Sequence, residues 1–356
     1  MEPLAILDLM MRGGAAGVSL ILAATLAHRA ATSSIARFGA LFAFAAACYA
    51  FISAPVVLEA MPLLCTILKP FAISTGVLFW WFALAMFCDQ KRWAWSRLIP
   101  FLVVFALAAT APAPGGEGWA RTAHLITESI TVVLMIHVIV IIALGAEDDL
   151  VEPRRKFRTV WSGAISLTVL AVCANEIWSL FFAAPPFLSL MEAALLLIVT
   201  SGATLWSLSA EPDFFPEDRV SAPDRPEPAI QAADRHLALQ LREAMAGGVY
   251  QEPGLTVGAL AERLGAPEHR LRAVINQQLG YRNFANFLNE HRIAEARRRL
   301  ENPADARRQI LQLALDLGYG SIAPFNRAFR DITGVTPTQY RRAALSDGLE
   351  GAEAAQ

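Results

Sequence analysis

Residues 310–342 read ILQLALDLGYGSIAPFNRAFRDITGVTPTQYRR, which is the pattern of two short amphipathic helices joined by a glycine-rich turn. The turn is Gly318-Tyr319-Gly320, and Ser321 stands where an N-cap is expected. The spacing of apolar residues predicts two buried helix faces that pack on each other: Ile310, Ala314 and Leu317 in the first helix, and Phe325, Ala328 and Phe329 in the second. This stretch predicts a helix-turn-helix.

The outward face of the second helix has the residue types that read base edges. A helix fits the major groove of DNA, where Arg and Asn form paired hydrogen bonds with guanine and adenine. Pro324 lies in the first turn, where proline is tolerated. The candidate DNA-contacting residues of this helix are Ile322, Ala323, Asn326, Arg327 and Arg330.

A similar unit lies upstream. Thr256 is placed to cap the helix VGALAERLG, Gly265-Ala266-Pro267 makes a turn, and a second helix is expected from Pro267 to Leu279. The residues expected to face outward from this second helix, and so to contact DNA, are His269, Arg270, Arg272 and Asn276. A lead helix at 233–245 precedes the unit and a long helix at 284–300 follows it. Two recognition helices joined by such a connector can enter successive major grooves, about 34 Å apart.

Charge divides the chain into three regions. The 356 residues are 55% hydrophobic and 17% charged, with a mean hydropathy of +0.42, which is apolar for a soluble protein. Residues 1–208 hold 12 basic and 12 acidic side chains, residues 209–230 are acidic, and residues 231–342 hold 16 Arg against 11 acids. The composition therefore predicts a membrane domain at 1–208, a linker and a basic domain.

The first region contains apolar runs long enough to cross about 30 Å of hydrocarbon. Seven spans are expected, at about 8–28, 38–58, 63–88, 97–112, 122–145, 159–183 and 187–208. Loops after spans one, three and five carry nine Lys and Arg residues, whereas the loops after spans two, four and six carry only Arg121. Positive loops stay in the cytoplasm, so the N-terminus is expected outside and the C-terminal domain inside the bacterial inner membrane.

Several polar side chains fall inside these spans, where ionisable groups are functional candidates. Counting helical turns places five of them in one layer near the outer face: Lys69, Glu128, Asn175, Glu176 and Glu192. Glu59 and His124 would lie at its rim, and His137 deeper. Two interpretations remain open: Lys69 pairs with a glutamate as a packing device, or the five residues bind an external small molecule or ion.

The sequence gives no support for catalysis. It has no P-loop, no HExxH and no nucleophile elbow, and its four cysteines lie in the spans without metal-ligand spacing. We therefore expect no enzyme activity, no cofactor and no metal site. Residues 209–230 hold five prolines and predict an extended acidic linker, and residues 344–356 are expected to be a disordered tail.

The C-terminal third resembles the AraC/XylS family of transcriptional regulators. The second unit matches the family pattern at Gly318, Tyr319, Ser321, Phe325, Arg327, Phe329, Arg330, Gly334, Thr336, Pro337, Tyr340 and Arg341. The first unit and connector match at Leu260, Ala261, Leu271, Gly280, Arg292, Ala296 and Leu300. Ala273 departs from the family, whose members often carry a base-contacting Arg there, so the bases that the first unit reads are in question. The resemblance covers 233–343 and leaves out the membrane part, although some relatives carry membrane bundles in place of a soluble cupin.

These observations predict an all-α protein: a seven-helix transmembrane bundle, then an AraC-type domain with two helix-turn-helix units at 231–343. The expected function is a membrane-embedded one-component transcription regulator controlled by a signal sensed in the bundle. Its expected partners are promoter DNA, the lipid bilayer, RNA polymerase, an unidentified small-molecule or ion signal, and a second copy of the chain. Two alternatives stay open: a membrane transporter or enzyme with an autoregulatory DNA-binding tail, and a bundle that only anchors.

Overall fold

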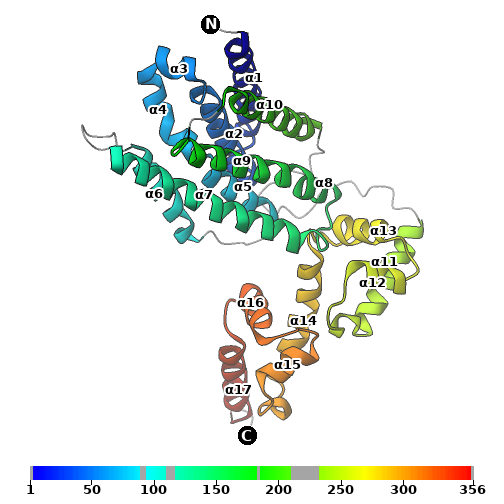
Figure 1. Ribbon diagram of the computed structural model, residues 1–356. Helices are drawn as coiled ribbons and strands as arrows, with labels where there is room; N and C mark the ends of the chain where they lie inside the picture. The colour runs from blue at the N-terminus through cyan, green and yellow to red at the C-terminus, as the bar shows by residue number, and fades with distance from the viewer. Residues whose placement is uncertain (1–2, 89–93, 110–116, 183–184, 210–231, 354–356) are drawn as a thin grey trace. The chain divides into compact units, whose positions relative to one another are not determined.

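The computed structural model describes residues 3–88, 94–109, 117–182, 185–209 and 232–353 (Figure 1). Within these ranges the chain is helical and has no β-strand, so the predicted all-α class is confirmed. The chain divides into two compact units. Unit 1 comprises Met1–Ala146 and Pro153–Pro223, and unit 2 comprises Glu147–Glu152 and Asp224–Gln356.

Unit 1 is built from long apolar helices, with α1 packed against α2 and α10, α2 against α4 and α5, and α7 against α5 and α9. Their bounds are α1 Pro3–Ala27, α2 Ser34–Ile52, α3 Pro55–Ala60, α4 Pro62–Ile73, α5 Thr75–Phe87, η1 Trp95–Arg97, α6 Leu98–Ala109, α7 Glu117–Gly145, α8 Glu152–Lys156, η2 Phe157–Trp161, α9 Ser162–Ser179 and α10 Pro186–Ser209.

Six of these helical segments are long and apolar enough to cross a membrane, where the sequence predicts seven spans. The fourth expected span is the short helix α6, whose 12 residues rise about 18 Å, less than the hydrocarbon core of a bilayer. Residues 110–116, which would extend it, lie outside the described residues. The third expected span is one apolar segment that the structure divides at Ser74 into α4 and α5.

Helix α5 is the core of unit 1. It is apolar on every face, and 11 of its 13 residues are buried. A helix of this kind needs neighbours all round, and Phe42, Phe157 and Leu134 pack against it from α2, η2 and α7. The surrounding helices turn large apolar side chains outward, including Leu63 at 81% and Leu144 at 78% exposure. Such a surface suits a lipid environment better than water.

The basic loop expected after the fifth span begins the next helix instead. Arg158 in η2 is 1% exposed. Its guanidinium donates to the carbonyl oxygens of Phe87 (3.1 Å) and Gly145, which are the last residues of α5 and α7. Helix C-termini carry unpaired carbonyls and partial negative charge, so this arginine stabilises two helix ends at once.

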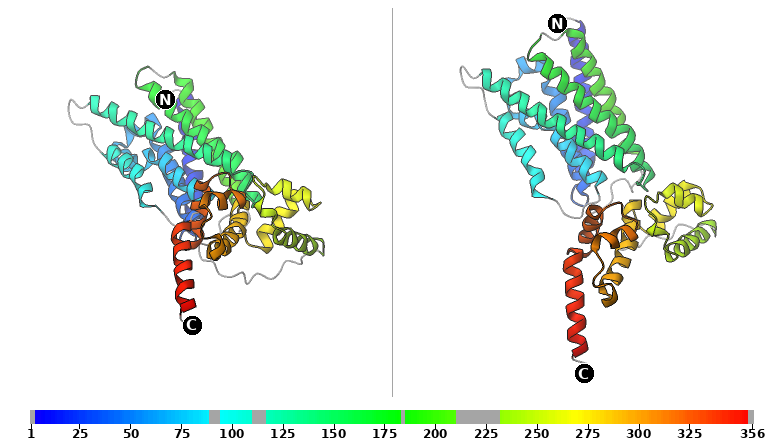
Figure 2. Two further views of the ribbon diagram at one scale, coloured as in Figure 1. Left: turned by 90° about the horizontal axis from the view of Figure 1, so that it is seen from below. Right: turned by 60° about the horizontal axis from the view of Figure 1, so that its bottom comes forward.

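Unit 2 contains the expected helices of the basic region. Their bounds are α11 Ala232–Ala246, η4 Val249–Gln251, α12 Val257–Arg263, α13 Glu268–Ala273, η5 Val274–Gln278, α14 Phe284–Glu301, η6 Pro303–Asp305, α15 Ile310–Asp316, α16 Ile322–Thr333 and α17 Pro337–Glu353. Helix α17 therefore continues through most of the tail that the composition predicts to be disordered, and its C-terminal half stands clear of the other helices of its unit (Figure 2). The expected linker lies almost wholly within residues 210–231, outside the described residues.

Helix α14 is shared by two separate hydrophobic cores. Phe284, Phe287 and Leu288, on its first turns, pack with α11, α12 and α13. Ile293, Ala296 and Leu300, on its later turns, pack with α15 and α16. One helix thus serves both halves of the unit, and the two halves are held in a fixed relation through it.

A short segment from far upstream completes the first half. Asp149 forms an antiparallel bridge with Asn283, while Leu150 N–H donates to the Arg282 carbonyl at 3.1 Å and Phe284 N–H donates to the Asp148 carbonyl at 2.8 Å. Leu150 is 4% exposed and belongs to the core that α11 to α14 form. Glu147–Glu152 is therefore a structural part of unit 2, which the sequence pattern did not indicate.

Candidate functional site

The second helix-turn-helix consists of α15, a tight turn and α16. Gly318 in the turn has φ +83°, and a Cβ there would lie 2.6 Å from the Gln251 carbonyl oxygen. Only glycine suits both the left-handed backbone and this close approach. Phe325 and Phe329 are fully buried on the inner face of α16, and Gly334 (φ +82°) ends the helix. Ser321 occupies the N-cap position, but its side chain makes no capping hydrogen bond.

The outer face of α16 is free of internal partners. Ile322, Ala323, Arg327 and Arg330 are exposed, and Asn326 is half-buried. No described residue pairs with the guanidinium of Arg327 or Arg330, so both charges are available to a polyanion. Spacing by four places Ile322, Asn326 and Arg330 along one side of the helix, with Ala323 and Arg327 beside them.

In the first helix-turn-helix, three of the four side chains expected to contact DNA are occupied by ion pairs or hydrogen bonds within the protein. Thr256 caps α12 as predicted, its side-chain oxygen accepting the Ala259 N–H at 3.1 Å. The following helix begins at Glu268, after Pro267, and continues as a π-helical turn, η5. Arg270 forms an ion pair with Asp234 of α11, and Asn276 donates to the Tyr281 carbonyl at 2.9 Å. Of the four candidates here, only His269 is exposed and without a partner among the described residues.

Arg272 does not face outward as the sequence predicts. Its side chain is 8% exposed. Nη1 donates to the Asp149 carbonyl and Nη2 to the Glu147 carbonyl, each at 2.8 Å, and Nε donates to Glu268 Oε1 at 2.8 Å. Helical periodicity places Arg272 on the outer side of α13, but it could not reveal that the segment 147–152 covers that side. Arg272 is occupied in holding this segment.

Arg292 of α14 ties the two helix-turn-helix units together. Nε donates to the Tyr250 carbonyl at 2.6 Å and Nη2 to the Glu252 carbonyl at 3.0 Å, both after α11. The same guanidinium lies 5.1 Å from the ring centroid of Tyr319, in the turn before α16. Burial lowers the pKa of Arg292, against the opposing effect of Tyr319. Even so, an arginine stays charged at neutral pH.

Two further groups of α14 titrate abnormally. Burial lowers the pKa of His291, whose ring packs against Tyr250 and Phe287. Burial alone would raise the pKa of Glu295, but hydrogen bonds from Arg298 and Arg299 bring it below its usual value. Arg298 and Arg299 are thus partly neutralised by Glu295, in contrast to the unpaired arginines of α16.

Unit 1 contains a cavity of about 770 Å³ whose wall includes several polar side chains. All five residues expected to form one intramembrane layer line it: Lys69, Glu128, Asn175, Glu176 and Glu192. His124, expected at the rim, also lines it and approaches Glu176 at 3.8 Å. Glu59 is exposed and does not line it, and His137 accepts a hydrogen bond from Trp80 Nε1 at 2.8 Å elsewhere in the bundle.

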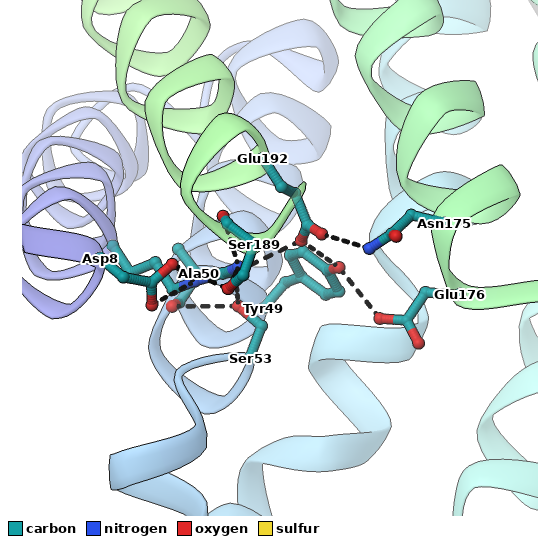
Figure 3. Close-up of polar contacts among 9 residues, drawn as sticks. Asp8, Tyr49, Ala50, Ser53, Asn175, Glu176, Ser189 and Glu192 are labelled. Atoms are coloured by element: carbon teal, nitrogen blue, oxygen red, sulfur yellow. Dashed lines mark hydrogen bonds and ion pairs between the residues drawn. The ribbon is translucent and has the colours of Figure 1, made fainter. Parts of the chain in front are cut away.

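Glu192 is the centre of the hydrogen-bond network around this cavity (Figure 3). It accepts from Arg12 Nη1 at 3.3 Å, from Tyr49 Oη at 2.9 Å and from Asn175 Nδ2 at 2.9 Å. Tyr49 also lies 3.2 Å from Glu176. A hydroxyl has one hydrogen, so Glu176 and Glu192 share a single donor.

Arg12 and Asp8 are the residues that sequence reasoning missed. Arg12 is 2% exposed; it pairs with Asp8 at 3.1 Å and donates to Ser53 Oγ at 2.6 Å and to Ser189. The signal was present, because Asp8 and Arg12 have the four-residue spacing of an ion pair on one helix face. Among the described residues, no group of three His, Cys, Asp or Glu side chains could hold a metal ion.

Comparison with known proteins identifies the C-terminal part. Residues 260–343 match a protein-family model described as a helix-turn-helix domain. An uncharacterized HTH-type transcriptional regulator of Staphylococcus aureus is 35% identical over 101 residues, which are 28% of this chain and 13% of the relative. Counterparts in strains MSSA476 and COL are 34% identical over the same length. No solved structure matches the chain.

The chain thus matches about an eighth of the length of these curated relatives. The predicted C-terminal helix-turn-helix is confirmed, and with it a DNA-binding domain of the kind that transcriptional regulators carry.

Proposed function

We propose that this chain is a membrane-embedded one-component transcription regulator of the AraC/XylS kind, which binds promoter DNA through unit 2 and senses a signal through unit 1. The observation that carries the DNA-binding part is the exposed face of α16, where Arg327 and Arg330 have no partner among the described residues. Unpaired arginines on a recognition helix suit both base edges and phosphates.

The second helix-turn-helix is proposed to make the main sequence-specific contacts. In the first helix-turn-helix of unit 2, Arg272 is hydrogen-bonded to the segment 147–152 and Arg270 is paired with Asp234. His269 has no partner in the part of the chain that the structure describes, and Arg270 reaches DNA if it exchanges its carboxylate partner for a phosphate. Helix α14 and Arg292 connect the two helix-turn-helix halves of unit 2, so both halves are proposed to contact DNA together.

The membrane part of the proposal is supported by six helical segments of sufficient length and apolarity. Helix α6 and the preceding η1 are proposed to belong to the seventh span, which the sequence predicts at about 97–112. An odd number of spans puts the two termini on opposite sides of the membrane. The basic residues that follow the first, third and fifth expected spans in the sequence favour an outside N-terminus and a cytoplasmic unit 2. Residues 209–230 are proposed to be an acidic tether.

The cavity in unit 1 is proposed to be the sensory site, with RNA polymerase and a second copy of the chain as further partners of the DNA-bound form. The supporting observation is that five polar residues from four helices, α4, α7, α9 and α10, surround one space. A single packing ion pair would not require such convergence.

The experiment that tests the function uses the full chain in lipid nanodiscs. Selection from random duplex DNA should enrich one sequence with two half-sites, and the affinity for it should fall steeply with salt. A reporter fused after Gln356 should be active in the cytoplasm. Failure to enrich any sequence, or reporter activity only in the periplasm, would show that the proposal is wrong.

A further inference from the structure

The cavity of unit 1 is lined by more acidic than basic side chains. Arg12, Lys69, Glu128, Glu176 and Glu192 all contribute to its wall. The charge of Arg12 is already used twice, by Glu192 at 3.3 Å and by Asp8, behind the wall, at 3.1 Å. Three carboxylates therefore line the cavity with two permanent cations, of which Arg12 also pairs with Asp8, and His124 adds one positive charge when it is protonated.

Glu128 of α7 is the buried carboxylate of this set that has no ion pair; Lys69 of α4 also has none among the described residues, but its side chain is exposed. Glu128 is 9% exposed, and among the described residues no Arg, Lys or His lies within ion-pair distance of it. The neighbouring polar side chain is the thiol of Cys173, a weak hydrogen-bond donor. A buried carboxylate without a cation or strong donors is costly, because its hydration is lost and little replaces it.

Glu176 adds to the same negative field. It interacts electrostatically with Glu128 and Glu192, and it shares the single Tyr49 hydrogen with Glu192. Its nearest cationic group is His124, at 3.8 Å. The carboxylate oxygens of Glu128 and Glu176 can thus accept more hydrogen bonds than the described residues donate to them.

The remainder of the wall is largely apolar. Side chains of Leu58, Ile73, Val169, Val172 and Leu196 line it. A site that combines a few fixed polar groups with an apolar wall is typical of small-molecule binding. An inorganic ion alone would leave most of this volume and apolar surface unused.

We propose that the cavity binds a small organic cation, an ammonium group beside Glu128 and Glu176 with an apolar body against the aliphatic wall. This inference rests on the proposed sensory role of unit 1 and adds the chemical class of the signal. The cation replaces the missing counter-charge of Glu128, so binding stabilises the bundle through an interaction that the free protein lacks.

The test uses the full chain in nanodiscs at constant pH, with 2-phenylethylammonium as the probe and phenylacetate and 2-phenylethanol as the anionic and neutral analogues. Only the ammonium compound should raise the thermal midpoint in a saturable manner. Glu128→Gln should weaken this binding by roughly tenfold or more, as loss of a buried charge pair does. Glu59→Gln removes an exposed carboxylate outside the cavity and should leave the affinity unchanged.

Three results would overturn the inference: equal stabilisation by phenylacetate, no stabilisation by any of the three compounds, or equal binding to the Glu128→Gln protein. A thermal midpoint that changes with pH but not with the ammonium compound would also overturn the inference, because the cavity would then take up a proton instead of an organic cation. DNA binding is measured on the same preparations, so a protein that binds DNA but ignores the ammonium refutes the ligand class and leaves the regulator function standing.

Discussion

Arg272 Nη1 donates to the backbone carbonyl of Asp149 at 2.8 Å, across 123 positions of sequence. The second nitrogen, Nη2, reaches the Glu147 carbonyl at the same distance. Two donors on one planar group match two carbonyls that lie two residues apart in the segment 147–152. An arginine of the first recognition helix is thereby a structural residue of unit 2.

Replacement of Arg272 by lysine should destabilise the first half of unit 2 without removing a DNA contact. A lysine ammonium is a single point of donation and cannot reproduce the three-way geometry of the guanidinium. We expect faster hydrogen exchange of the amides of α13 and the start of α14 in the full chain. The salt dependence of DNA binding should stay unchanged, whereas a shallower dependence would show that Arg272 contacts phosphate.

Removal of Arg327 should weaken operator binding while the fold is kept. Arg327→Ala deletes an exposed, unpaired guanidinium from α16, and loss of a base contact costs about 1–3 kcal/mol. Circular dichroism should be unchanged. The matched control is Arg298→Ala on α14, whose charge is already paired with Glu295, and it should bind the operator almost normally.

Gly318→Ala should disrupt the second helix-turn-helix. The left-handed backbone (φ +83°) and the Gln251 carbonyl at 2.6 Å from the new Cβ together should cost at least about 2 kcal/mol. Exchange of the α15 and α16 amides measures the effect. Gly320→Ala, two positions away, has an ordinary φ and open space around the new Cβ, so it should be tolerated.

The stability of α14 should fall as the pH is lowered through the ordinary pKa of histidine. Burial lowers the pKa of His291 in the folded chain, so the unfolded state takes up a proton at a pH where the folded state does not. The loss should be less than about 1 kcal/mol, because the ring is half-buried. Amide exchange between pH 7.5 and 5.5, corrected for the intrinsic rate, should show the slope in the natural chain and a smaller one in His291→Gln. His269→Gln, at an exposed histidine, should keep the natural slope.

Arg12→Met should destabilise unit 1. The substitution leaves Asp8 and Glu192 buried without a cation, and breaking a buried pair in this way costs about 3–5 kcal/mol. The thermal midpoint of the full chain in nanodiscs should drop clearly. Arg29→Met, at an exposed position after α1, serves as the control. Equal midpoints for the two variants would contradict a structural role for Arg12.

Local sequence patterns predicted the helices well because helices are formed by neighbours in sequence. The lead helix, the cap at Thr256, the connector and the α16 face all follow from periodicity and capping chemistry. Counting turns predicts one level for Glu128, Glu176 and Glu192, because the rise per residue is constant in a helix, and all three line the same cavity.

Contacts between distant segments could not be predicted in the same way. Nothing in the sequence around Leu150 distinguishes a surface loop from a segment buried in unit 2, since the partner lies more than a hundred residues away. Arg272 was expected outside for the same reason. Helix α6 was expected as a full span because composition gives apolarity but does not give where a helix stops.

The inclusion of Glu147–Glu152 means that unit 2 is assembled from two separate pieces of chain. A truncated protein that starts at residue 231 lacks Leu150, which leaves a gap in the hydrophobic core. Arg272 also loses two carbonyl acceptors, those of Glu147 and Asp149. Transplantation of this module onto another membrane protein would therefore require two grafts: the C-terminal region and a six-residue insert between two of the recipient's spans. A chimera joined at a single point would carry an incomplete DNA-binding unit.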